Sequence, residues 1–243
     1  MIELFQIPPS FGVPSASPFC LRVEAYMRLA GVEFKNHTDA DPRKSPKGKV
    51  PWIVDDGEAI GDSSFILEHL ATRHGADLDA ALTPEQRAIS HAVSRMLCEN
   101  FYWVGVHSRW AYEPNWAQFK AGFVKLLPPV IGPLVLPLIR GNVKKQLHGH
   151  GLGRHTDDEI ARIGRRDLDA LEVLLGDRET FFGGAPTSID ATAYAFLACM
   201  LIPPFDTPTR RHLQGKPTLV AFVRRMQERL FPDYPVELHG AAA

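Results

Sequence analysis

Short apolar runs and an amphipathic helix alternate at the start of the chain. Ile2 to Ile7 forms a run typical of a β-strand. From Pro18 to Ala30 apolar residues recur at steps of three and four, which predicts a helix, and Gly31 is suited to end it. The following VEFKNH predicts a second strand. The chain therefore begins with a strand, a helix and another strand.

Two further apolar runs, KVPWIVDD and GEAIGD, are joined by Asp56-Gly57. That dipeptide is a strong indication of a tight hairpin turn, so we expect two paired strands here. Asp62-Ser63 then supplies a helix cap before SFILEHLATRH. These elements together predict a small α/β domain over residues 1–76.

After about residue 76 the short alternation ends and long helical patterns replace it. Thr83 is a capping residue followed by a proline and an acid, and the helix that it starts should continue through HAVSRMLCENFYWVGVHSRW. Further helices are predicted over 157–175, 187–201 and 218–230. We therefore expect an all-helical domain over residues 83–243.

Composition narrows the class of protein. Hydrophobic residues make up 45% and charged residues 23% of the 243 residues, which is ordinary for a globular chain. Lys+Arg number 27 against 28 Asp+Glu without a basic block, so nucleic acid is not an expected partner.

Cys20, Cys98 and Cys199 are far apart, which indicates neither a disulfide framework nor a thiolate zinc site. With no signal peptide at MIELFQIPPS, we expect a reducing, cytoplasmic location.

The most apolar stretch is LLPPVIGPLVLPLI, residues 126–139. It carries four prolines and is shorter than the roughly 20 residues of a spanning helix, so no transmembrane segment is expected. We interpret it as a buried connection or a covering loop. The alternative is a patch that contacts a membrane surface or a partner.

Candidate chemistry begins at Ser17-Pro18, where the first helix starts. Free backbone N–H groups and the positive end of the helix dipole favour an anion there, such as a phosphate, carboxylate or thiolate, and a serine hydroxyl can donate one more hydrogen bond. In the simpler interpretation Ser17 only caps its helix.

Two further stretches favour a small charged peptide as ligand. Lys49-Val50-Pro51 places a proline at the start of a strand, where a cis bond would expose the backbone of Val50 to an extended peptide. Asp62-Ser63 presents a hydroxyl, a carboxylate and backbone donors at a second helix start. Together they predict a strand edge and two anion sites.

These motifs, in this order, resemble the glutathione transferase superfamily with its thioredoxin-like first domain. They are SPFC at a helix start, GKVP before a hairpin, DS at the next helix and an all-helical second half. FQIPPSFGVPSASPFCLRVEAYMRLAG, GHGLGRH and FFGGAPTSIDATAYAFL are similar, more narrowly, to the branch around failed-axon-connections proteins and metaxins. The implied fold is a thioredoxin-like domain followed by an all-helical domain.

The resemblance implies a glutathione site. Ser17 would meet the sulfur of glutathione, with Ser10 and Ser15 as open alternatives. Val50 before Pro51 would pair with the cysteine backbone, Asp62-Ser63 would hold the γ-glutamyl end, and Lys49 would reach the glycine carboxylate. Thr187-Ser188-Ile189-Asp190 matches the structural capping box of the second domain.

One departure from the redox members of the superfamily bears on the reaction. They carry a cysteine where this chain has Ser17, so a disulfide with Cys20 is not available, and Cys20 is interpreted as a buried packing residue. The hypothesis is a transferase that ionises bound glutathione and joins it to a small apolar electrophile. The alternative is a non-catalytic interaction module, as metaxin-like proteins suggest. The family likeness also implies a homodimer.

The helical half offers weaker candidates. Trp103, His107 and Trp110 share one helical face and could line the pocket of the second substrate, with His107 as a base. A core aromatic stripe is the alternative. LHGHGLGRH gathers three histidines without an acidic or cysteine ligand, so no metal is expected.

Overall fold

The computed structural model describes residues 1–127 and 132–238. Its first part contains a four-stranded sheet of β1 (Ile2–Phe5), β2 (Phe34–His37), β3 (Trp52–Asp55) and β4 (Glu58–Gly61), in the order β2-β1-β3-β4. β1 runs parallel to β2 and antiparallel to β3, and β3 pairs antiparallel with β4. All four predicted strands are confirmed.

The β3–β4 hairpin forms as its Asp-Gly turn predicts. Asp56 and Gly57 both have positive φ, 47° and 84°, which is the left-handed geometry of the favoured two-residue turn. Asp55 pairs with Glu58, and Ile53, which is fully buried, pairs with Ile60. The turn thereby fixes which side of the hairpin meets the core.

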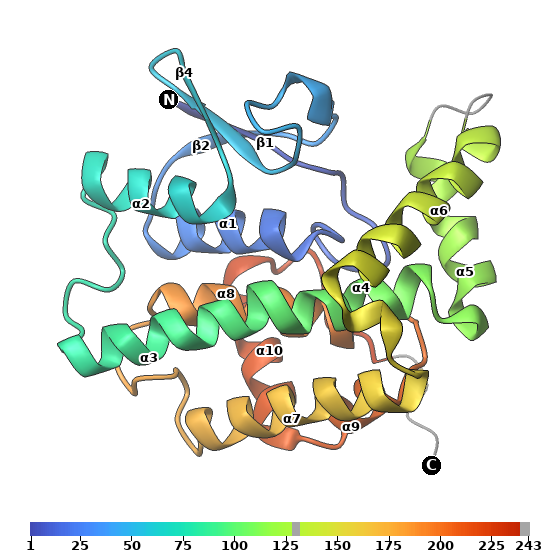
Figure 1. Cartoon of the computed structure of the whole chain (residues 1–243). Coiled ribbons are helices and arrows are strands. Elements are labelled where there is room, and N and C mark those ends of the chain that lie inside the picture. Colours follow the sequence, from blue (N-terminus) through green and yellow to red (C-terminus); the bar gives the residue numbers. More distant parts are fainter. Residues whose placement is uncertain (128–131, 239–243) are drawn as a thin grey trace.

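Two helices lie between the sheet and the helical half of the molecule (Figure 1), namely α1 (Pro18–Leu29) and α2 (Ser63–Arg73). α1 packs against α2 and, more extensively, against α8 (Ser188–Leu201). Leu21 and Val23 of α1 are fully buried and belong to the same continuous core as α8. The sheet and the helical half thus share one core.

The second half is helical throughout the described residues. Besides α8, its elements are α3 (Pro84–Arg95), the π-helical segment η2 (Met96–Phe101), α4 (Tyr102–Trp110), α5 (Glu113–Phe123), α6 (Gly132–His150), α7 (Asp157–Leu175), α9 (Pro208–Gln214) and α10 (Pro217–Leu230). Short 3₁₀ turns form η3 (Val124–Leu126) and η4 (Leu152–Arg154) in this half, and another, η1 (Pro42–Lys44), lies between β2 and β3 in the first half. The long helix predicted from Thr83 is present, with a π-helical segment inserted in its middle.

α8 is the central helix of this half, and its start is held by buried polar bonds. Every residue from Ile189 to Leu201 is buried. The carboxylate of Asp190, with no exposed surface, accepts the N–H of Thr187 at 2.8 Å and that of Phe181 at 2.9 Å. The predicted capping box is therefore present.

The apolar stretch 126–139 departs from the expected connection or loop. Residues 128–131 lie outside the described residues, and from Gly132 onward the stretch belongs to α6, which contains Pro137. Leu136 is buried, whereas Leu134 and Leu138 are 75% and 74% exposed. A loop is the wrong interpretation from Gly132 onward because Pro137 removes only one backbone bond near the start of a 19-residue helix. None of the described helices has the length and apolar character needed to cross a membrane.

Candidate functional site: two adjoining cavities

The start of α1 has the geometry of an anion site. Ser17 is the capping residue, and its Oγ accepts the N–H of Cys20 at 3.4 Å. A serine hydroxyl that accepts one bond keeps its own proton to donate. The N–H of Phe19 has no backbone acceptor among the described residues. Two donors are therefore available at the positive end of the helix dipole.

The three serines near this point differ in their surroundings. Ser15 is fully buried, donates to the carbonyl oxygen of Ile7 at 3.5 Å and accepts the N–H of Ser17 at 3.4 Å. The Ser10 hydroxyl is buried without a partner among the described residues. Ser17 lines the aromatic cavity described below, and neither of the other two does. Ser17 is thus the serine that the geometry presents to a ligand.

A polar cavity of about 460 Å³ collects the predicted glutathione residues. Lys49, Val50, Pro51, Asp62 and Ser63 all line it. The remaining lining residues come from the loop before β3 and from α1, α2, α3, η2 and α4: Phe19, Lys47, Ser64, Phe65, Arg95, Cys98, Glu99, Tyr102 and Trp103. The structure therefore brings together in one cavity five residues that the sequence placed in two separate motifs.

The backbone at this cavity has the expected features. The Val50–Pro51 peptide bond is cis. Among the described residues, neither the N–H nor the C=O of Val50 has a backbone partner, so both can pair with a bound peptide. Asp62, at a φ of 82°, caps α2 by accepting the N–H of Ser64 at 2.8 Å.

A buried arginine that no sequence motif indicated lies behind the cavity. Arg22 is 6% exposed and donates to the hydroxyls of Ser63, Ser64 and Thr192 at 2.9–3.2 Å. Burial lowers the pKa of its guanidinium. Its side chain joins α1 to α2 and α8 and so fixes Ser63. Its position within a buried helix gave no signal, because the hydroxyls that satisfy it are distant in sequence.

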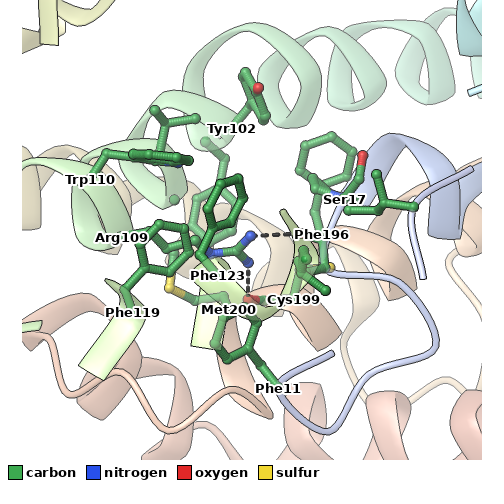
Figure 2. Close-up of a pocket in the computed structure, with 17 residues that line it drawn as sticks. Phe11, Ser17, Tyr102, Arg109, Trp110, Phe119, Phe123, Phe196, Cys199 and Met200 are labelled. Atoms are coloured by element: carbon green, nitrogen blue, oxygen red, sulfur yellow. Dashed lines mark hydrogen bonds between the residues drawn. The ribbon is translucent and has the colours of Figure 1, made fainter. Parts of the chain in front are cut away.

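An aromatic cavity of about 180 Å³ adjoins the polar one. Figure 2 shows Ser17 on one side of it and a cluster of aromatic rings on the other. The aromatic rings that line it are Phe11, Phe101, Tyr102, Trp110, Phe119, Phe123 and Phe196. Tyr102 lines both cavities, and its ring packs on that of Phe19 at 4.8 Å between centroids. The aromatic cavity suits a small apolar molecule.

One cationic group lies among these rings. Arg109 donates to the carbonyl oxygens of Ala16 and Cys199, at 2.6 Å each (Figure 2). These two bonds use two of the five donors of a guanidinium, and Ala16 immediately precedes Ser17. Arg109 therefore places a positive charge beside the start of α1. No sequence motif indicates this contact, because the partners of Arg109 are two backbone carbonyls.

The three residues predicted for a second-substrate pocket separate in the structure. Trp110 lines the aromatic cavity and Trp103 lines the polar cavity. The ring of Trp103 stacks on that of His150, with 4.7 Å between the ring centroids. His107 is buried, lines neither cavity, and its Nε2 lies 3.1 Å from the Asp157 carboxylate. Burial lowers the pKa of His107. This placement leaves it no role as a base in either cavity.

Cys20 and Cys199 contribute no reactive group. Cys20 is fully buried, and burial raises the pKa of its thiol to about 11 against the opposing effect of Ser17. Burial likewise raises the pKa of Cys199 to about 11. The interpretation of Cys20 as a packing residue is confirmed.

Comparison with known proteins assigns the family. A family model for the glutathione S-transferase N-terminal domain matches residues 18–116, and one for the C-terminal domain matches residues 164–226. The isoprene-epoxide–glutathione S-transferase of Rhodococcus sp. (strain AD45) is 32% identical, over 94% of this chain and 99% of that protein. Failed axon connections of Drosophila melanogaster is 34% identical over 96% of this chain, which spans 59% of that longer protein.

A solved structure shows the same fold. The β-etherase of Sphingobium sp. strain SYK-6 superposes with a TM-score of 0.62 at 14% identity, over 96% of this chain and 99% of the other. The expected fold, a thioredoxin-like sheet domain followed by a helical domain, is thereby confirmed, and so is the resemblance to failed-axon-connections proteins. The chain belongs to the glutathione S-transferase family.

Proposed function

We propose that this chain is a glutathione transferase. Glutathione occupies the polar cavity with its thiol at Ser17, and a small apolar electrophile occupies the aromatic cavity. The observation that carries the proposal is that the two cavities meet at α1 and share Tyr102. On this proposal residues 1–76 bind glutathione, and residues 83–243 supply most of the second pocket.

The charges around the polar cavity complement those of glutathione, which carries two carboxylates and one ammonium group. Lys47, Lys49 and Arg95 offer cations to the carboxylates, and Asp62 offers a carboxylate to the ammonium group. The free N–H and C=O of Val50 pair with the cysteine residue of the peptide. That pairing directs the thiol toward the start of α1.

Ser17, the Phe19 N–H and the helix dipole stabilise the thiolate. A reduction of the thiol pKa by about two units corresponds to about 2.7 kcal/mol of differential stabilisation. One charge-assisted hydrogen bond contributes about 1.5–3 kcal/mol, so the hydroxyl and the helix end are sufficient. Arg109 adds a positive charge from the adjoining cavity.

The electrophile class follows from the cavity and from one relative. The aromatic lining favours an apolar molecule, and the relative from Rhodococcus is named for an epoxide of isoprene. We therefore propose small apolar epoxides as substrates. The thiolate attacks one ring carbon, the carbon–oxygen bond breaks, and the oxygen takes up the proton that the thiol released.

The test is an ultraviolet difference titration of the protein with glutathione against pH. S-methylglutathione serves as the thiol-less ligand, Ser17→Ala as the test variant and Ser10→Ala as the matched control. We expect a thiolate signal below the pH at which free glutathione ionises. The apparent pKa should rise by about 1–2 units in Ser17→Ala, from the loss of one charge-assisted bond, and stay unchanged in Ser10→Ala.

Absence of any thiolate signal, together with no binding of S-methylglutathione, would refute glutathione binding. Binding without turnover across a broad panel of apolar epoxides would refute the transfer step. The transfer step can therefore fail while glutathione binding stands.

A second candidate function is protein or membrane interaction. The exposed Leu134 and Leu138 on α6 favour it, and a relative named failed axon connections is compatible with it. The double substitution of both leucines by glutamate separates the candidates. Unchanged glutathione chemistry with loss of a partner would favour interaction.

A further inference from the structure

A second group of chemistry-bearing residues lies at the opposite end of α2 from the polar cavity. Asp55 is the last residue of β3, His69 lies in the second half of α2, and His74 caps that helix. Ser63 and Arg73, the two ends of α2, are separated by about 15 Å along the helix axis. The group is therefore distinct from the glutathione site.

The three side chains converge closely. The Nε2 atoms of His69 and His74 lie 2.7 and 2.6 Å from the same Oδ2 of Asp55. One potential ligand atom from each residue falls within 4.8 Å of the others. The exposed fractions of the side chains are 8% for Asp55, 15% for His69 and 33% for His74, so the group is sheltered but reachable.

The backbone holds these residues in place. Asp55 pairs with Glu58 across the hairpin, and the N–H of His74 donates to the carbonyl oxygen of Leu70 at 3.1 Å. Gly75 follows with a φ of 62°, which ends α2 at this point. The ligand atoms are therefore preorganised by a strand end and a helix end.

An open cavity of about 390 Å³ gives access to the group. Asp55 and His74 line it together with the acids Glu33 and Asp56, and no Lys or Arg side chain is among its lining residues. The surroundings thus favour a cation and leave room for a water ligand.

We propose that Asp55, His69 and His74 form a binding site for a divalent transition metal ion, with zinc as the best fit. Two imidazoles and one carboxylate form a donor set that zinc prefers, and three protein ligands leave a fourth position for water. The ion takes the place of the hydrogen bonds between the imidazoles and Asp55, and each neutral ring binds it through Nε2 with its single proton on Nδ1. Metal–ligand bonds of about 2.0–2.1 Å require the ligand atoms to separate to about 3.3 Å, a small side-chain movement.

This proposed metal site departs from the sequence-based expectation that the chain binds no metal. The histidines of LHGHGLGRH, which prompted that question, do not form it: His150 stacks on Trp103 and His155 lies 3.6 Å from Glu159. Asp55 precedes His69 by fourteen residues, a spacing without a metal signature. Folding alone brings the three together.

The test uses the metal alone, so its result does not depend on glutathione. Zn²⁺ affinity is measured on the whole chain by competition with a chromophoric chelator, and Co²⁺ serves as the spectroscopic substitute. We expect one ion per chain and the visible absorption bands of four-coordinate Co²⁺. Affinity should fall at least about tenfold in His74→Gln and in Asp55→Asn. His155→Gln, which removes an exposed histidine elsewhere, should leave it unchanged.

A measurement on the unaltered protein guards against variants that fail to fold. Zn²⁺ should shift the imidazole nitrogen resonances of two histidines, and these should be assignable to His69 and His74. Absence of stoichiometric Zn²⁺ binding would overturn the proposal. It would also be overturned if His74→Gln and His69→Gln both bound Zn²⁺ as tightly as the unaltered chain.

Discussion

Asp167 on α7 provides a pH test of the packing around the π-helical segment. The residue is 8% exposed, and its Oδ2 accepts the Nδ2–H of Asn100 in η2 at 2.7 Å. Burial raises the pKa of the carboxyl from 3.8 to about 6, against the opposing effect of the Asn100 bond. A single buried carboxyl thus titrates within an accessible pH range.

The sign of the effect follows from the two states. In the unfolded chain Asp167 ionises near its ordinary pKa, whereas in the folded chain it keeps its proton until about pH 6. Its contribution to stability is fully present below the unfolded pKa and is lost as the pH rises through the folded pKa. A shift of about two units corresponds to a total of about 3 kcal/mol.

Asp167→Asn keeps the size of the side chain and an acceptor for Asn100 but removes the ionisation. At about pH 7.5, above both pKa values, we expect a free energy of unfolding about 3 kcal/mol above that of the unaltered chain. At about pH 5 the difference should be smaller by about 1 kcal/mol, because the unaltered carboxyl is then protonated when folded. Urea denaturation at both pH values measures it.

Asp169 provides the matched control, two residues away. It is 54% exposed, and hydrogen bonds from Lys216 and His212 lower the pKa of its carboxyl. Asp169→Asn should therefore give no gain in stability at the higher pH. A difference between Asp167→Asn and the unaltered chain that stays constant, or shrinks, as the pH rises would refute the reasoning.

Two further substitutions test packing around the central helices. Asp190→Ala leaves two buried backbone N–H groups without their acceptor and should lower the free energy of unfolding by about 3 kcal/mol, measured by urea denaturation. Gly164→Ala puts a Cβ 2.9 Å from Val104 Cγ1 and Thr209 Cγ2 and should cost about 1–3 kcal/mol. Gly141→Ala, where a Cβ meets nothing within 4 Å, should be neutral or stabilising, and an equal loss in both glycine variants would contradict this account.

Local sequence signals were sufficient for the elements whose conformation is decided locally. The hairpin follows from Asp56-Gly57, and α1 from its capping serine and apolar spacing. α6 was not predicted, because prolines argue against a helix, although Pro137 costs it only one backbone bond near its start. The π-helical segment η2 carries no local signature, because its extra residue per turn is accommodated by packing.

The residues of the candidate site likewise fall into those that local sequence signals predict and those that depend on contacts between distant segments. The order of these motifs along the chain anticipated that Val50-Pro51 and Asp62-Ser63 share one cavity, and Ser17 lines the adjoining one. The apolar stripe of Trp103, His107 and Trp110 did not predict one, because α4 packs against α5, α6, α7 and α8 and each face of it meets a different neighbour. Arg109 and the cluster at Asp55 depend on contacts between distant segments, which periodicity cannot reveal.

The position of α1 has a consequence for cooperativity. This helix carries Ser17 at its start and is enclosed by α2 on one side and α8 on the other. Arg22 bonds across that boundary to Thr192, and Arg109 bonds back to Ala16. Neither half can therefore open without exposing apolar surface and unpaired polar groups of the other. The start of α1 therefore opens only when the entire molecule opens, so the donors that we propose for glutathione stay in place.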